Sequence, residues 1–227
     1  MKKTVRVLVL LVAATFISAN AFAQLPISLG VKAGANLSNV SYDDETDFDT
    51  KAKAGFQVGL DVKANIPLTG IFIQSGLALT TKGYKIDESE YDEYEDVTYK
   101  FEQKSNAMFL QVPIMAGYNI SVPGIGVNLA AGPYFAYGIG GKTKVKYVDP
   151  IDPEYSFNQK ESTFDEDKGG IKKFDMGLTG AVGVEISKFY VNLGYEFGLT
   201  NLAGKEWESG DKLKNRNAYL TIGYKIF

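Results

Sequence analysis

The residues of this chain that could do chemistry are carboxylates, lysines and tyrosines. The sequence contains no His and no Cys, so the commonest general base, the commonest metal ligand and the thiol nucleophile are all absent. Ser-His-Asp triads, His-based zinc sites and Cys proteases are therefore excluded. Asp175 and Glu185, together with Glu196, could form a carboxylate pair for acid–base work. We favour the alternative, in which these groups form structural ion pairs with lysines.

Two acidic stretches and one tryptophan are the other candidates for binding. Residues 87–96 and 149–154 could hold Ca²⁺, which prefers carboxylates, but neither has EF-hand spacing. We favour solvated surface loops for both. Trp207 could be an aromatic platform for a ligand or partner, and we favour loop packing. We therefore predict no catalytic, cofactor-binding or metal-binding residue, no cofactor and no enzyme.

The N-terminal residues have the pattern of a secretory signal. Lys2, Lys3 and Arg6 precede an uncharged apolar run over residues 7–17, and Ala21-Phe22-Ala23 places small residues where signal peptidase reads. This predicts a signal peptide over residues 1–23 and a single domain over residues 24–227. Its removal leaves 21 of the 24 basic residues against 27 acidic ones, a net charge of −6. Nucleic acid is disfavoured as a partner.

The rest of the sequence alternates apolar and polar residues in eight segments. Each is about as long as the ~9–11 residues with which a tilted strand crosses a bilayer. The segments are residues 27–39, 53–66, 71–84, 106–119, 125–138, 173–186, 189–200 and 216–227. Without apolar helices, a membrane protein must be a closed barrel. We predict an all-β fold, an eight-stranded antiparallel up-and-down transmembrane β-barrel. A ten-strand count, with residues 97–101 in an extra hairpin, is the alternative.

The connections between these segments alternate in length. Residues 67–70, 121–124 and 187–188 read as tight turns, whereas residues 40–52, 85–105, 139–172 and 201–215 are long and polar. Outer-membrane barrels have short periplasmic turns and long outer loops. The order predicts that both ends of the barrel domain lie on the periplasmic side. Residues 143–148 suggest that some strands extend beyond the membrane.

The two faces of the segments distinguish a membrane barrel from a soluble one. A soluble eight-stranded barrel, such as a lipocalin, points its apolar face inward. Here the polar face is rich in glycine, which suits a narrow lumen better than a water-exposed surface. The other face is Leu, Val, Ile, Phe and Ala, which favours lipid. Five tyrosines near strand ends are predicted to form interfacial girdles: Tyr84, Tyr118, Tyr137, Tyr195 and Tyr224.

An eight-stranded barrel has an interior just wide enough for side chains to fill. The charged residues predicted to share it are Lys32, Lys63, Lys225, Asp61, Asp175, Glu185 and Glu196. They should pair, because isolated buried charges are costly. The sequence thus predicts a filled lumen and a structural or surface-binding role through the long outer loops. A small-solute porin of low conductance is the alternative, and an embedded hydrolase is disfavoured by the missing His.

Four motifs resemble those of a known family. Residues 173–185 (KFDMGLTGAVGVE) resemble its R-F-D-x-G-L-x-x-G-x-G-x-E strand, and residues 110–114 (LQVPI) resemble its L-E-I-P-L strand. Residues 132–134 (GPY) and 194–201 (GYEFGLTN) resemble its G-P-Y and Y-x-x-G-L-x-N segments. Together, and in their order along the chain, the four motifs resemble those of the small outer-membrane β-barrel family common in Bacteroidetes, often labelled porin-family or PorT-like.

This resemblance implies an outer-membrane location and an eight-stranded barrel. The implied partners are outer-membrane lipid, the barrel-assembly machinery during insertion, and an extracellular ligand or protein at the loops. Phe227 resembles the terminal aromatic signal for that machinery, although Ile226, Tyr224 and Ile222 are out of phase with it. One branch of the family serves protein secretion and gliding, and no motif here belongs to that branch.

Overall fold

The computed structural model describes residues 26–42, 50–92, 94, 96–205, 207 and 212–226. The predicted signal peptide and Phe227 lie outside these residues, so both remain predictions from sequence. In the part of the chain that is described, no helix is long and apolar enough to cross a membrane.

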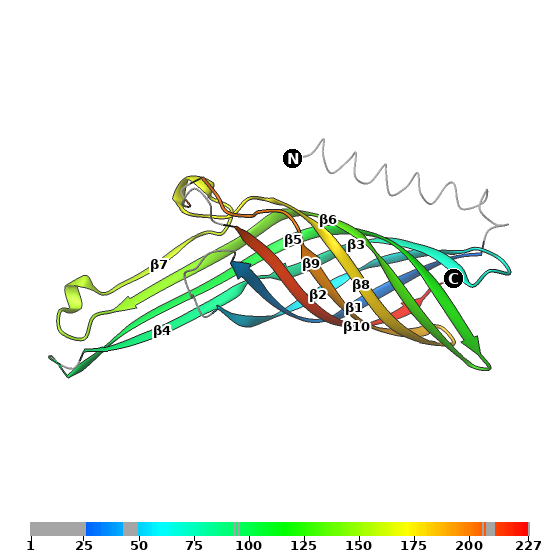
Figure 1. The fold of residues 1–227 in the computed structure, drawn as a ribbon, viewed down its shortest axis with the longest axis horizontal. Helices are drawn as coiled ribbons and strands as arrows, with labels where there is room; N and C mark the ends of the chain where they lie inside the picture. Colours follow the sequence, from blue (N-terminus) through cyan, green and yellow to red (C-terminus); the bar gives the residue numbers. More distant parts are fainter. Residues whose placement is uncertain are drawn as a thin grey trace.

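Eight long strands form a closed antiparallel ring (Figure 1). They are β1 (Ile27–Tyr42), β2 (Thr50–Asn65), β3 (Ile71–Lys82), β5 (Val97–Val122), β6 (Ile125–Val148), β8 (Phe174–Ile186), β9 (Phe189–Gly198) and β10 (Leu213–Lys225). Each pairs with the next in this order, and β10 pairs back onto β1 from Gly30↔Lys225 to Tyr42↔Leu213. The predicted eight-stranded up-and-down barrel is confirmed.

The tight turns lie together at one end of the ring, as predicted. A turn at residues 67–69 joins β2 to β3, Pro123 and Gly124 join β5 to β6, and Ser187 and Lys188 join β8 to β9. Gly124 has a φ of +85°, which the absence of a Cβ permits. The start of β1 and the end of β10 lie at this same end, where Ile226 N donates to Leu29 O at 2.7 Å.

Two further strands extend the sheet beyond the ring at the opposite end. β4 (Tyr84–Asp92) pairs with β5 and at its base with β2, and β7 (Phe157–Ser162) pairs with β6. Figure 1 shows β4 and β7 beside the extensions of β5 and β6, which project past the other strands. We call these four strand segments, residues 84–106 and 140–162, the outer sheet. The ring has eight strands, and the whole sheet has ten.

The outer sheet differs from the long loops expected over residues 85–105 and 139–172. β5 has 26 residues and β6 has 24, more than twice the ~9–11 that cross a bilayer. The reason is that alternation continues in the polar sequence: Val145 and Tyr147 follow Thr143 on one face, with lysines between them. Loop structure remains around two short 3-10 helices, η2 (Pro153–Tyr155) and η3 (Glu166–Lys168).

Side chains of the ring alternate between an exposed apolar outside and a buried inside. Along β9, Leu193 is 56% exposed, whereas Tyr190 and Glu196, which have the opposite parity, are 6% and 2% exposed. Exposed apolar residues from every strand of the ring form a continuous outer band, including Val31, Leu60, Ile73, Ile114, Leu129, Leu178, Leu193 and Ile222. The predicted allocation, apolar side chains outward and polar ones inward, is correct.

Tyr84 is an exception to the predicted tyrosine girdles. Tyr118, Tyr137, Tyr195 and Tyr224 are exposed on the outside, but Tyr84 is only 3% exposed and lies inside. The even-numbered residues of β3 point inward, and β4 keeps this parity across Gly83, so Tyr84 follows Lys82 into the interior. Burial raises the pKa of its phenol, to which the Gln103 amide donates a hydrogen bond at 3.2 Å.

Candidate functional site

Charged side chains fill the half of the lumen near the tight turns. Lys32 Nζ lies 2.7 Å from Asp61 Oδ1, and Lys63 Nζ lies 2.7 Å from Glu185 Oε1. Lys225 forms a second ion pair with Glu185. Lys32 and Asp61 lie on the adjacent strands β1 and β2, whereas Lys63 on β2 and Glu185 on β8 lie on opposite sides of the ring. All of them were predicted to share the lumen.

A second ionic cluster lies deeper, in the half of the lumen near the outer sheet. Lys82 Nζ lies 2.9 Å from Glu196 Oε2 and 3.5 Å from Asp175 Oδ2, and the side chains of Lys82 and Asp175 are fully buried. The ammonium also lies 4.3 Å from the centre of the Tyr134 ring. The residues of this cluster are at most 2% exposed, so they fill this part of the lumen with groups buried from solvent.

Neutral donors add to the coordination of these two carboxylates, although Asp175 Oδ1 has no hydrogen-bond partner within the described ranges. Glu196 accepts from Asn217 Nδ2 at 3.0 Å and from the Gln111 amide. Asp175 Oδ2 accepts from Asn215 Nδ2 at 2.9 Å and from Tyr134 Oη at 3.1 Å. Because each carboxylate has several donors as well as the ammonium, burial of the three charges is supported. Asp175 and Glu196 thus pair with a lysine in the lumen, as predicted.

Lys82 was missed in the prediction of the lumen charges. Asp175 and Glu196 were placed there without a nearby cation, because the polar face of the third segment was followed only to Thr80. The signal was available: Lys82 has the parity of Ala78 and Thr80, both of which point inward. With Lys82, four lysines balance four carboxylates in the lumen.

Aromatic rings occupy the space that the lumen glycines leave. A Cβ at Gly223 would lie 2.0 Å from the Tyr190 ring, and a Cβ at Gly138 would lie 2.3 Å from the Phe164 ring. Tyr190 Oη then donates to Asp61 Oδ2 at 2.7 Å. The glycine-rich face was expected to make room for long polar side chains, and it also makes room for aromatic rings that lie flat on the wall.

A small polar cavity remains in the half of the lumen near the tight turns. Its volume is about 40 Å³, and its walls include Lys32, Asp61, Lys63, Glu185 and Tyr219. A site needs roughly 10–15 Å³ on this measure to hold one water. The cavity therefore has room for a few waters at most.

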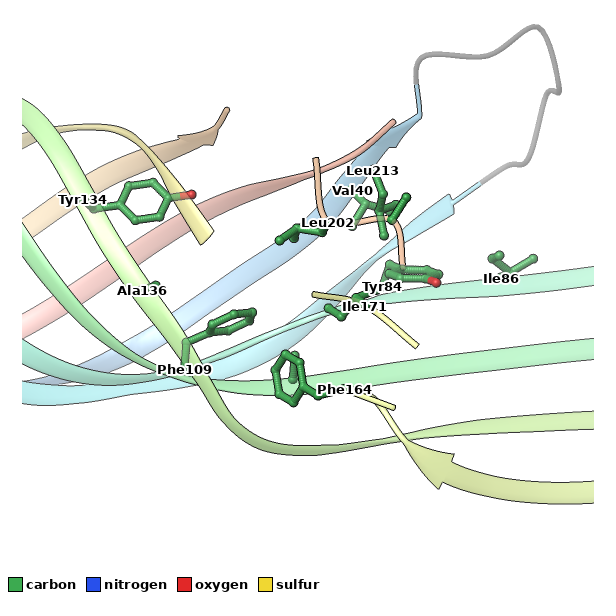
Figure 2. Packing of buried hydrophobic residues seen from close by; sticks show 12 residues of the cluster. Val40, Tyr84, Ile86, Phe109, Tyr134, Ala136, Phe164, Ile171, Leu202 and Leu213 are labelled. Atoms are coloured by element: carbon green, nitrogen blue, oxygen red, sulfur yellow. The ribbon is translucent and has the colours of Figure 1, made fainter. Parts of the chain in front are cut away.

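Buried apolar residues close the mouth of the barrel at the outer-sheet end. Phe164, Ile171, Leu202 and Ala203 come from the connections and pack onto strand residues; we call these four the mouth cap. Figure 2 shows Phe164 beside Phe109, and Leu202 beside Val40 and Leu213. The rings of Phe109 and Phe164 meet edge to face, with centroids 5.5 Å apart. No pattern of period two marks these connection residues, so nothing in the sequence alone predicts their burial.

Backbone hydrogen bonds hold the mouth cap in place. Ile171 N donates to Thr163 O at 2.8 Å, Lys172 N to Leu202 O at 2.9 Å, and Leu202 N to Leu213 O at 2.8 Å. The two connections before β8 and before β10 are thus joined to each other and to the ring. The cap is a packed, hydrogen-bonded part of the fold, because its backbone groups are paired as well as its side chains.

The other predicted candidates have structural surroundings. Asp149 Oδ1 accepts from the backbone of Ile151 and Asp152, and Asp152 caps η2. Among the described residues, which omit Glu93 and Glu95, no three carboxylates are grouped to hold a metal ion. Trp207 stacks on Tyr42 with ring centroids 6.0 Å apart and donates to Gly169 O at 3.2 Å, which agrees with loop packing.

A closed antiparallel ring with an apolar outside and an ionic inside defines the class of transmembrane β-barrels. A family model described as an outer membrane protein beta-barrel domain matches residues 22–204. The chain belongs to this family and is a protein of the outer membrane. No curated protein matches it significantly.

Several solved outer-membrane proteins are similar to the chain. A major outer membrane protein from Thermus thermophilus is 12% identical, with 88% of this chain and 100% of that chain covered and a TM-score of 0.44. Ail, the attachment invasion locus protein of Yersinia pestis, is 16% identical over 88% and 99%, with a TM-score of 0.39. Neisserial surface protein A is 9% identical over 87% and 97%, with a TM-score of 0.40.

Proposed function

We propose that this protein is a sealed, non-enzymatic barrel that anchors the outer sheet at the cell surface. Its role is structural or binding, carried by the outer sheet and the mouth cap. The orientation follows from the short turns, which barrels of this class keep in the periplasm. One observation carries the proposal: Lys82, Asp175, Phe109 and Leu202 close the lumen with side chains that have no exposed surface.

A low-conductance porin is the second candidate. It is favoured by the polar cavity near the tight turns, where the side chain of Lys225 is 25% exposed. A path for solutes would have to continue past Lys82 and the mouth cap. This would require separating buried ion pairs and apolar contacts together, so we rank the porin second.

Liposome swelling separates the two candidates. We expect liposomes that contain the folded barrel to swell in arabinose or glycine no faster than liposomes without protein, because a cavity of about 40 Å³ does not admit either solute. A general porin in matched liposomes is the positive control. Swelling in proportion to the amount of folded barrel would contradict the sealed lumen and support the porin.

We propose further that the chain belongs to the small outer-membrane β-barrels common in Bacteroidetes, often labelled porin-family or PorT-like. The support is the order of the four motifs at residues 110–114, 132–134, 173–185 and 194–201. The partners proposed with it are outer-membrane lipid, the barrel-assembly machinery and an extracellular ligand. Proximity labelling from residue 94, at the tip of the outer sheet, tests the last: labelling of lipid alone would contradict a protein partner.

A further inference from the structure

Lysines gather on one face of the outer sheet, the face continuous with the apolar outside of the ring. We call it the lysine face; its members are Lys85, Lys100, Lys104, Lys142, Lys144, Lys146 and Lys160. On β5 these are even-numbered positions, as are the lipid-facing residues Leu110 and Val112 below them. The lysines therefore point outward over the surrounding membrane rather than over the barrel mouth.

Four of these lysines stand in a single row across four strands. Lys85 lies opposite Lys104, Lys104 opposite Lys144, and Lys144 opposite Lys160. Like charges directly opposite each other destabilise a sheet. Such a row is therefore costly unless an anion from outside the chain lies against it.

The chain itself supplies few anions to this face. The carboxylates that share it are Asp87 and Glu102. Asp87 lies 3.8 Å from the ammonium of Lys51, which stands opposite Lys85 on β2. Among the described residues Lys104 is the only member of the lysine face, as defined above, in an ion pair, with Glu102 at 3.0 Å. The ammonium of Lys104, and more weakly those of Lys146 and Lys100, lower the pKa of Glu102. The positive charge of the face thus exceeds what its own carboxylates neutralise.

The opposite face of the same strands has a different character. It carries Glu88 and Glu161, and an aromatic row in which Phe101 lies opposite Tyr147 and Tyr147 opposite Phe157. No lysine alternates onto it within the paired positions of β4, β6 and β7. Because the lysines of these strands all lie on one face, the basic face is a directed feature and not the general charge of an exposed loop.

The lysine face begins at the height of the lipid headgroups and continues above them. Ile139 is the last exposed apolar residue of β6, and Lys142 follows three residues later, about 10 Å along the strand. With a strand tilt of ~40°, this is roughly 8 Å along the membrane normal. Headgroups occupy about 5–8 Å beyond the hydrocarbon core, and the row of four lysines lies just above.

We propose that the lysine face binds the phosphate groups of the glycolipid in the outer leaflet around the barrel. The like-charged row, its outward direction and its continuity with the lipid-facing band together point to an anion carried by the membrane. A soluble polyanion would have equal access to both faces. The inference rests on the proposed function only in placing the outer sheet outside the cell.

The test is a titration of folded barrel in phosphatidylcholine nanodiscs with fluorescent, doubly phosphorylated lipid A. We expect Lys85, Lys104, Lys144 and Lys160, replaced together by Gln, to weaken the apparent affinity at least about tenfold, since each lysine near an anionic surface contributes substantially. The same four residues replaced by Arg should stay within about twofold of the parent. Added salt should weaken the binding of lipid A to the parent protein.

Two exposed lysines that already have carboxylate partners provide the matched control. Lys168→Gln with Lys205→Gln, which lose pairs to Glu161 and Asp167, should leave the affinity unchanged. Equal binding of lipid A without phosphates, or an unchanged affinity of the Gln variant, would overturn the proposal. Tighter binding of soluble dextran sulfate than of lipid A would also overturn it. Liposome swelling on the same variants reports separately on the sealed lumen.

Discussion

Replacing Lys82 by Met is expected to destabilise the folded barrel by about 3–5 kcal/mol, the usual cost of removing one partner of a buried ion pair. Lys82 and Asp175 have no exposed side-chain surface, and Glu196 has 2%. Without the ammonium, two carboxylates remain buried with hydrogen bonds but no counter-charge. Reversible urea unfolding of the barrel in lipid vesicles, followed by heat-modifiable gel migration, measures the change.

Two further variants separate charge from packing at Lys82. Lys82→Met combined with Asp175→Asn and Glu196→Gln removes all three charges and should recover most of the lost free energy. Lys205→Met breaks an exposed pair with Asp167 and should change stability by less than about 0.5 kcal/mol. Equal effects of Lys82→Met and Lys205→Met would show that the cluster does not contribute to the fold.

Replacing Phe109 by Ala is expected to lower the free energy of unfolding by about 3–5 kcal/mol, the usual range for a fully buried Phe. Phe109 has no exposed surface and packs edge to face on Phe164 of the mouth cap. Loss of the Phe109 side chain leaves a cavity between the ring of strands and the mouth cap. Urea unfolding measures the cost, and faster cleavage near residue 164 by added protease reports the loosened cap.

A double-mutant cycle measures the coupling between the side chains of Phe109 and Phe164. Phe164→Ala should cost less in the Phe109→Ala background than alone, by roughly 0.5–1.5 kcal/mol. Phe157→Ala, an exposed ring of the outer sheet, serves as the control and should cost less than about 1 kcal/mol. Additive effects of the first two substitutions would mean that the cap is not held by this contact.

The ring could be predicted because its signal is repeated in every strand. A period of two places Leu193 outside and Glu196 inside, and lipid accepts only apolar side chains on the outer face. The same rule extends to Lys82 and Tyr84, so those two errors came from stopping the alternation too early. The pairs of Lys63 and Lys225 with Glu185 were predictable as a balance of charge and not as particular partners, because strand stagger sets which residues meet.

The alternation rule could not predict the mouth cap, and it predicted the outer sheet only in part, through residues 143–148. Phe164 and Leu202 are single apolar residues in polar connections, and nothing local distinguishes them from exposed ones. Their burial depends on where the connections before β8 and β10 cross the mouth. The lysine row likewise needs the register of four strands, since Lys85 and Lys160 lie far apart in the sequence and share a row only after pairing.

The most direct test of the account is the environment of its outer face. The chain has no Cys, so single Cys residues at Leu178, Val182 and Leu193 can carry nitroxide labels in a folded barrel reconstituted into bilayers. We predict strong collision with oxygen and weak collision with a water-soluble nickel chelate at all three sites, with the reverse at Ser89 on the outer sheet. Strong nickel collision at the three ring sites would contradict a lipid-facing exterior, and with it the sealed transmembrane barrel.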